Sequence, residues 1–247
     1  ETLEQAQQNK INHIIKKLDL RPGQTVLDIG CGYGSMCFEI AKQSECEVTG
    51  YTLSQNQYDY CVKKAKELKL DNQCHFELSD YREIKGKFNR IVSVGMLEHV
   101  GRKFYKTFFK TINKLLKDDG LFLLHTIGVV DSLSPPNKFI NKYIFPGGTC
   151  PSFSQIISPI EKTGLIVSDS ETLIRHYDKT LESWLERFLD KKREVKDLFD
   201  EKFVKMWEFY MASCAAAFRY RDLVVFQLQI VKNFQSAHRT RDYIYKT

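Results

Sequence analysis

The sequence lacks any run of apolar residues long enough to cross a bilayer, and its first residues do not have the pattern of a signal peptide. Its seven cysteines are odd in number, form no Cys-x-x-Cys motif and have no zinc-type spacing with histidine. These absences disfavour a membrane-spanning protein and a disulfide scaffold. They predict a reducing, cytoplasmic location and no bound metal.

The rest of the composition is that of an ordinary water-soluble protein. The 247 residues are 43% hydrophobic and 28% charged, which is enough for one large α/β domain with a sizeable core. The formal net charge of +6 favours an anionic partner surface, for which nucleic acid and membrane both qualify. From charge alone, a merely basic soluble protein is the simpler interpretation.

The clearest local signal is a short apolar segment around Asp28, followed by Gly30, Gly32 and Gly34. The pattern predicts a buried strand, a tight turn and a helix that begins at Ser35. Glycines let the backbone approach a ligand, and the first turn of the helix offers free N–H groups. The Asp-x-Gly-x-Gly-x-Gly spacing resembles the first motif of S-adenosylmethionine (SAM)-dependent methyltransferases. A nicotinamide site is the alternative.

Strand and helix patterns alternate along the rest of the chain. Further strands are expected at residues 47–52, 74–78, 90–95, 121–127, 165–168 and 223–231, and helices at 3–19, 54–70 and, for the most part, 178–218. Runs that are apolar on both faces are typical of a parallel sheet between two helix layers. We therefore expect a single doubly wound α/β domain over residues 1–247, with helices on both faces of the sheet.

Three regions outside this alternation carry separate expectations. Residues 128–150 are rich in aromatic, proline and glycine residues, and they predict a lid or acyl groove or, equally, a loop packed on the protein's own core. The aromatic stripe within 178–218 favours core packing over a cofactor pocket. The basic tail from Lys232 onward is expected to be solvated.

The second predicted strand ends without an acidic residue. Many methyltransferases place a carboxylate there to bind the ribose hydroxyls, whereas this sequence has Gly50-Tyr51-Thr52. The hydroxyl and amide groups of Thr52, Ser54 and Gln57 are therefore the candidates for that role.

Polar residues at other strand ends are candidates for catalysis. Glu98 follows the fourth strand, where a buried carboxylate is costly unless it is paired. His125 interrupts an apolar strand; the alternative is a core histidine with satisfied hydrogen bonds. Cys31 lies close to a helix N-terminus, which predicts a lowered thiol pKa, unless it is merely a small residue that fits the loop.

Six segments in order along the chain resemble the motifs of cyclopropane-fatty-acyl-phospholipid synthases and, more distantly, of mycolic acid cyclopropane synthases. They are residues 26–32, 52–57, 93–101, 124–128, 141–148 and 214–219. The resemblance implies a class I SAM-dependent methyltransferase fold. It also implies a SAM site formed by Leu27, Asp28, Gly30, Cys31, Gly32, Gly34, Ser35, Thr52, Leu53, Ser54, Gln57, Asp80, Tyr81, Arg82, Val94 and His99.

The reaction implied by the resemblance is transfer of a methyl group from SAM to the cis double bond of a phospholipid acyl chain. The resulting carbocation must lose a proton for the cyclopropane ring to close, so the site should be dry and apolar. A bound bicarbonate is the implied base, held by Cys31, Glu98, His125, the Ile127 backbone and Tyr177. Ionised Glu98 would repel this anion, so it is expected to orient a donor or to accept the anion's own proton.

Other side chains are expected to line the reaction site. Cys214 lies among small residues and is expected to pack closely beside it. Aromatic faces that could stabilise the cation are those of Tyr33, Tyr143, Phe145 and Tyr177.

The resemblance also carries expectations about partners and location. Such synthases commonly have an additional N-terminal lipid-binding domain, and this sequence is expected to begin after it. The expected partners are unsaturated phospholipid acyl chains at an anionic inner-membrane surface, where the protein would be peripheral. A homodimer is possible, and no nucleic acid is expected.

Three alternatives remain open at the level of sequence. A lipid C-methyltransferase would make a methyl branch from the same alkene. A small-amine N-methyltransferase of the coclaurine type would share the Gly-Gly-Thr-x-Pro-Ser turn found at residues 147–152. A catalytically silent SAM-binding or membrane-interaction module belongs to a different class.

Overall fold

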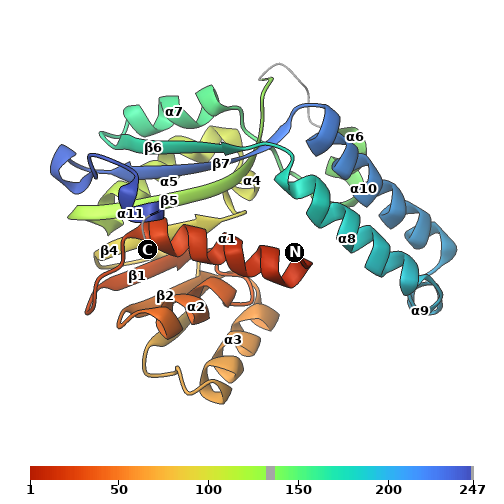
Figure 1. The fold of residues 1–247 in the computed structure, drawn as a ribbon, viewed down its shortest axis with the longest axis horizontal. Coiled ribbons are helices and arrows are strands. Elements are labelled where there is room, and N and C mark those ends of the chain that lie inside the picture. The colour runs from red at the N-terminus through yellow and green to blue at the C-terminus, as the bar shows by residue number, and fades with distance from the viewer. Residues whose placement is uncertain (132–136, 246–247) are drawn as a thin grey trace.

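The computed structural model describes residues 1–131 and 137–245, in which seven strands form one sheet of order β3-β2-β1-β4-β5-β7-β6 (Figure 1). The strands are β1 (Thr25–Ile29), β2 (Glu47–Thr52), β3 (Cys74–Leu78), β4 (Phe88–Val94), β5 (Leu116–Val129), β6 (Ile166–Leu173) and β7 (Leu223–Val231). The first five pair in parallel, but β7 runs antiparallel to both β5 and β6. The predicted α/β class is confirmed, with a mixed sheet in place of a wholly parallel one.

Helices cover both faces of this sheet. They are α1 (Leu3–Leu18), α2 (Ser35–Gln43), α3 (Gln55–Glu67), α4 (Leu97–Val100), α5 (Tyr105–Leu115), α6 (Lys138–Tyr143), α7 (Phe153–Glu161), α8 (His176–Asp190), α9 (Lys192–Leu198), α10 (Glu201–Tyr220) and α11 (Asp242–Tyr245), with short 3₁₀ helices η1 (Tyr81–Glu83), η2 (Arg102–Phe104) and η3 (Phe234–Ser236). Within the described ranges, no helix is both long enough and apolar enough to cross a membrane.

The strands separate two apolar cores. Val26 packs into the core beneath α1, α2 and α3, whereas its neighbour Leu27 packs into the core beneath α5 and α7. Val92 and Ile91 of β4 divide in the same way. Because successive side chains of a strand point to opposite faces, a sheet buried on both sides requires apolar residues at every position.

Helices α8, α9 and α10 form a lobe beyond the end of the sheet at which β5 and β6 finish (Figure 1). The region 178–218, expected to be mostly helical, lies within these three helices and the short breaks between them. Part of the predicted insertion at 128–150 lies outside the described residues, at 132–136. Its helix α6 contacts the lobe, because Phe139 packs edge-on against Phe209 of α10 with 4.8 Å between ring centres.

The C-terminal segment is not the solvated tail that its basic composition suggested. Ile244 of α11 is buried, Arg241 forms an ion pair with Asp169 of β6, and His238 stacks on Tyr243. The guanidinium and imidazole groups find specific partners on the sheet and on the tail itself. Charge count alone does not reveal such pairing.

The glycine loop after β1 has the left-handed backbone that its sequence predicts. Gly30, Gly32 and Gly34 have φ angles of 80°, 57° and 76°. A Cβ on Gly34 would lie 3.0 Å from Cys61 and Phe38, whereas a Cβ on Gly32 would meet nothing within 4 Å. Backbone conformation alone therefore requires glycine at position 32, and crowding adds a second requirement at position 34.

This difference predicts unequal costs for two alanine substitutions. Both Gly32→Ala and Gly34→Ala place an L-residue at positive φ, which costs about 1 to 2 kcal/mol. Gly34→Ala should lose about 1 to 3 kcal/mol more, because its methyl group overpacks the contact with Cys61 and Phe38. Urea unfolding of both variants measures the difference. Equal losses would show that the neighbours of Gly34 relax freely.

Candidate active site

The topology places the candidate site at the carboxyl ends of β1 and β4. The strand order reverses at β1, and ligands of doubly wound sheets bind in the crevice at such a switch point. The glycine loop follows β1 and helix α4 follows β4. The N–H groups of Gly30 and Cys31 both donate to the carbonyl oxygen of Tyr51 at 3.0 Å, which fixes the loop to β2.

Two residues expected to bind SAM lie inside the protein. Leu27 is fully buried in the core beneath α5, so only its backbone is available to a ligand at this edge. Asp28 is also buried, and its carboxyl accepts a hydrogen bond from the Cys37 thiol at 3.5 Å. Burial raises the pKa of Asp28 to about 7. Ser35, the first residue of α2, is exposed.

The residues after β2 form a local hydrogen-bond network. The Thr52 hydroxyl donates to Oε1 of Gln57 at 2.6 Å and accepts from the Ser54 N–H at 3.2 Å. The Ser54 side chain caps α3 by accepting from the Gln57 N–H at 3.4 Å. Leu53 between them is exposed. Because Oε1 of Gln57 accepts from Thr52, the amide NH₂ of Gln57 is the group oriented to donate elsewhere.

The remaining residues expected to bind SAM have separate surroundings. Asp80 forms an ion pair with Arg82 at 2.7 Å and caps η1. Tyr81 packs edge-on against Phe108, and Val94 is half-buried at the end of β4. His99 is exposed, with its ring 5.9 Å from that of Phe145.

Glu98 is the most unusual charged residue of the site. It lies on α4, its side chain is buried at 7% exposure, and one carboxyl oxygen accepts the Ile127 N–H at 2.6 Å. The other oxygen, Oε2, is buried and has no hydrogen-bond partner among the described residues. Burial raises the pKa of Glu98 above its usual value. The Ile127 N–H, expected to bind an anion, is thus already bonded to this carboxyl.

His125 lies two residues before Ile127 on β5 and is 5% exposed. Its Nδ1 lies 3.1 Å from Nε2 of Gln227, its partner across the sheet on β7. Burial, assisted by the positive charges of Lys10 and Lys17, lowers the pKa of His125 to about 3. Sequence reasoning missed Gln227, although a glutamine within the apolar run of β7 is a detectable anomaly.

Tyr177 and Cys214 join Ile127 at the base of the helical lobe. The three residues pack around the small cluster formed by Leu181, Ala215, Phe218 and Val225. The Tyr177 ring stacks on Phe218 at 5.1 Å, and burial followed by the charge of Glu98 raises the tyrosine pKa. Burial also raises the pKa of Cys214 to about 11. The structure therefore brings Glu98, Ile127, Tyr177 and Cys214 into one neighbourhood.

Cys31 has a different environment, and the prediction of a lowered thiol pKa was wrong. A hydrogen bond with Cys37 is the largest of the effects that raise the Cys31 pKa above its usual value, and burial adds to it. Gly34, not Cys31, is the N-cap of α2. The Cys31 thiol lies with buried Cys37 beside Asp28, and no described contact joins it to Glu98 or His125.

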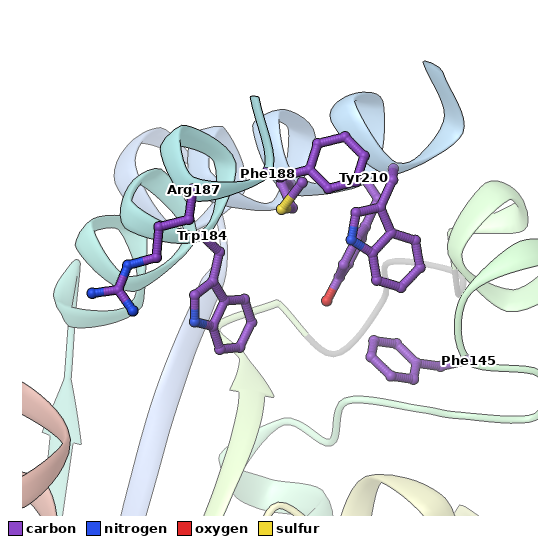
Figure 2. A pocket seen from close by; sticks show the side chains of 7 residues that line it. Phe145, Trp184, Arg187, Phe188 and Tyr210 are labelled. Atoms are coloured by element: carbon purple, nitrogen blue, oxygen red, sulfur yellow. The ribbon is translucent and has the colours of Figure 1, made fainter. Parts of the chain in front are cut away.

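An apolar pocket of about 410 Å³ opens in the helical lobe (Figure 2). Its lining residues are Phe145, Trp184, Arg187, Phe188, Trp207, Tyr210 and Met211. Trp184 and Tyr210 extend from α8 and α10 toward the side of Phe145, whereas Arg187 points away. The aromatic stripe, expected to be core, therefore lines a pocket as well; Trp184 is 39% exposed.

Aromatic contacts connect this pocket to the neighbourhood of Glu98. Trp184 packs edge-on against Tyr177, and Phe145 packs edge-on against both Tyr210 and His99. The segment after Phe145 is anchored to α4, since the Thr149 N–H donates to the Glu98 carbonyl at 2.9 Å. Of the other predicted aromatic faces, Tyr33 on the glycine loop is 56% exposed and Tyr143 is 46% exposed.

Comparison with known proteins identifies the family. The family model for mycolic acid cyclopropane synthetase matches residues 1–228. The chain belongs to this family. The Escherichia coli K12 cyclopropane-fatty-acyl-phospholipid synthase is 40% identical over 239 residues, which cover 97% of this chain and 61% of that protein. A probable fatty acid methyltransferase of Pseudomonas putida is 34% identical, over 99% of this chain and 65% of that protein.

The chain thus spans less than two thirds of the length of these two relatives. Solved structures of family members superpose closely. The cyclopropane synthase MmaA2 from Mycobacterium tuberculosis gives a TM-score of 0.87 at 33% identity, covering 93% of this chain and 85% of that one. The mycolic acid cyclopropane synthase CmaA1, complexed with SAH and CTAB, gives 0.87 at 31% identity with the same coverage.

A more distant structure, coclaurine N-methyltransferase bound to N-methylheliamine and SAH, gives a TM-score of 0.82 at 25% identity. It covers 94% of this chain and 72% of that one. These comparisons confirm the resemblance and the methyltransferase fold predicted from the sequence.

The buried, neutral imidazole of His125 predicts a pH dependence of stability. An unfolded chain binds a proton near pH 6.5, whereas the folded chain resists protonation until about pH 3. The free energy of unfolding should therefore fall as the pH drops below about 6.5. His125→Gln should make this decline shallower in urea unfolding between pH 7 and 4. His75→Gln at an exposed site is the control, and equal slopes in all three proteins would contradict the prediction.

Proposed function

We propose that the protein transfers a methyl group from SAM to the cis double bond of an unsaturated phospholipid acyl chain and closes a cyclopropane ring. The observation that carries the proposal is the buried Oε2 of Glu98, which has no hydrogen-bond partner among the described residues and lies with Tyr177 and Ile127 beside an aromatic pocket. Membership of the cyclopropane synthetase family supports the same reaction.

The residues of the glycine loop fit SAM. Gly32 has open space where a side chain would be, so its backbone is accessible to the cofactor. In this proposal Gly30, Gly32 and Gly34 cradle SAM, and the Gln57 amide binds its ribose hydroxyls in place of the missing carboxylate. When bound, SAM would supply an electrophilic methyl group.

The donor set near Glu98 fits a small oxyanion such as bicarbonate, which would supply a base for the proton lost at ring closure. Burial favours the protonated form of Glu98, which removes the repulsion that an ionised carboxylate would exert. Protonated Glu98 and the Tyr177 hydroxyl can then both donate to the anion. In this proposal the Glu98 carboxyl also exchanges its proton with the anion when ring closure delivers a proton there, which an amide could not do. Glu98 also holds the Ile127 backbone, and His125 donates a further hydrogen bond to the anion. Cys31, whose thiol has no described contact with Glu98 or His125, is assigned to the site by the resemblance alone.

The aromatic pocket fits an acyl chain. Its lining is apolar apart from Arg187, the Tyr210 hydroxyl and the two tryptophan N–H groups, and it adjoins Tyr177 through Trp184. Such a lining excludes water, which would otherwise trap the carbocation, and aromatic faces stabilise positive charge. Cys214 packs against the cluster at the base of the lobe and has a raised pKa, so we assign it to packing rather than to nucleophilic attack.

The cellular setting follows from the substrate. We propose a cytoplasmic protein that is peripheral at an anionic inner-membrane surface, which the net charge of +6 supports. The methyl-branching alternative differs only in how the cation is resolved. The coclaurine-type alternative has less support, because an apolar pocket of this size suits an acyl chain better than a small amine.

Product analysis tests the reaction directly. The protein is incubated with SAM and vesicles of anionic phospholipid bearing cis-unsaturated chains, with and without bicarbonate, and the fatty acids are identified by mass spectrometry. We expect a cyclopropane chain whose yield depends on bicarbonate. A methyl-branched product would show that the protein catalyses the methyl-branching alternative and does not close a ring. Measurable SAM binding without any lipid product, in vesicles or in detergent, would overturn the lipid assignment.

Glu98→Gln separates chemistry from cofactor binding. The amide keeps the size of the carboxyl group but cannot give or take its proton, so turnover should fall roughly 100-fold or more. The dissociation constant for SAM, measured by calorimetry, should stay within about twofold of the unaltered protein, an order-of-magnitude expectation for a contact outside the cofactor site. Glu161→Gln, at an exposed site on α7, is the matched control. Loss of SAM binding in Glu98→Gln would contradict the assignment of Glu98 to the chemical step.

A further inference from the structure

A row of polar side chains crosses three strands of the sheet behind the candidate site. Gln227 of β7 lies directly opposite His125 of β5 on one side and Glu171 of β6 on the other. Residues at matching register positions share one face of the sheet. This row is continuous from the buried His125 to the partly exposed Glu171.

Helix α1 completes the row with a buried cation. The ammonium group of Lys17, only 1% exposed, donates to Oε1 of Gln227 at 2.9 Å and forms an ion pair with Glu171. His13, one helical turn earlier, contacts the same Glu171 oxygen at 2.7 Å. Burial would raise the Glu171 pKa, but the hydrogen bonds from His13 and Lys17 outweigh it and lower that pKa to about 2.

The chemistry of an ammonium group determines the orientation of the Gln227 amide. Lys17 can only donate hydrogen bonds, so it must face the carbonyl oxygen of the amide. The NH₂ group of Gln227 therefore faces His125 and donates to Nδ1 at 3.1 Å. A neutral imidazole that accepts at Nδ1 carries its proton on Nε2.

We propose that Gln227 and Lys17 are positioning residues, which hold His125 in the tautomer that carries its hydrogen on Nε2. The effect on turnover rests on the function proposed above, in which His125 donates a hydrogen bond to the bound anion. The tautomer itself follows from the contacts alone. Lys17 acts through the amide, because without its ammonium group either end of Gln227 can face the imidazole.

Several charged groups face this row from the elements packed against it. Lys10, His13 and Lys17 come from α1, and Glu171 comes from β6. Burial and, after it, the positive groups oppose protonation of His125, so the ring stays neutral while Gln227 sets its tautomer. Gln229, two residues along β7, binds the Lys17 carbonyl and Tyr243 instead of His125.

The test is nitrogen NMR of the full chain with ¹⁵N-labelled histidine, with the His125 signals identified by their absence in His125→Gln. The unaltered protein should show a protonated Nε2 and an unprotonated Nδ1. Gln227→Glu replaces the NH₂ donor by an acceptor that still pairs with Lys17, so Nδ1 of His125 should become protonated. Gln227→Met and Lys17→Met should give a mixture of tautomers. Gln229→Met, which removes a buried amide from the same strand, should leave His125 unchanged.

Turnover provides the second measurement. Gln227→Glu should lower kcat on the order of 10-fold to 100-fold without changing the KM for SAM. The expected size is that found when a metal-bound histidine loses the hydrogen-bond partner of its other ring nitrogen. A proton on Nδ1 in the unaltered protein, or an unchanged tautomer in both Gln227 variants, would overturn the proposal. The NMR result needs no substrate. If the product analysis fails while the tautomer responds as expected, the positioning role survives and the proposed reaction does not.

Discussion

The hydrogen bond from the Ile127 N–H to the Glu98 carboxyl is the contact on which the candidate site depends. It joins α4, which follows β4, to the end of the neighbouring strand β5, beside the switch point between β1 and β4. The Glu98 backbone carbonyl also accepts the Thr149 N–H, so the aromatic segment that carries Phe145 is tied to the same residue. Burying a carboxyl group costs several kcal/mol unless it is well paired, and here one oxygen has no hydrogen-bond partner within the part of the chain that the structure describes. That cost is easier to reconcile with a ligand site than with structural packing.

Burial shifts the pKa values of Glu98 on α4 and His125 on β5 in opposite directions, but in both cases it disfavours the charged form. It raises the pKa of Glu98 and lowers that of His125, so both groups favour their uncharged forms. A site in which burial disfavours charge suits a reaction that passes through a carbocation, because charged nucleophiles are disfavoured there while hydrogen-bond donors are retained. Tyr177, whose pKa is also raised, stays a donor in the same way.

The features that could be predicted from the sequence are those determined by residues close together along the chain. The tight turn at Gly30, Gly32 and Gly34 and the helix that follows Ser54 depend on residues close together in the sequence. Glu98 and His125 could be identified because each conflicts with its apolar surroundings. What the sequence could not supply depends on distant contacts: the raised pKa of Cys31 comes from thiols brought together by the fold. The partnership of Gln227 with Lys17 spans 210 positions and needs the antiparallel β7, which the apolar pattern does not distinguish from a parallel strand.

The two sides of the candidate site, the glycine-loop side proposed for the cofactor and the lobe side proposed for the acceptor, therefore depend on different kinds of contact. The glycine loop and the Thr52 network are built from short segments at the ends of β1 and β2, and their geometry is set locally. The acceptor side is assembled from α4, β5, the 145–150 segment and the α8–α10 lobe, whose contacts are long-range. A fold organised in this way can keep its cofactor loop while the lobe changes. This accounts for a coclaurine N-methyltransferase that superposes at a TM-score of 0.82 with only 25% identity. For the proposed reaction, we therefore expect acceptor specificity to reside in the aromatic lobe and in the residues that tie it to Glu98.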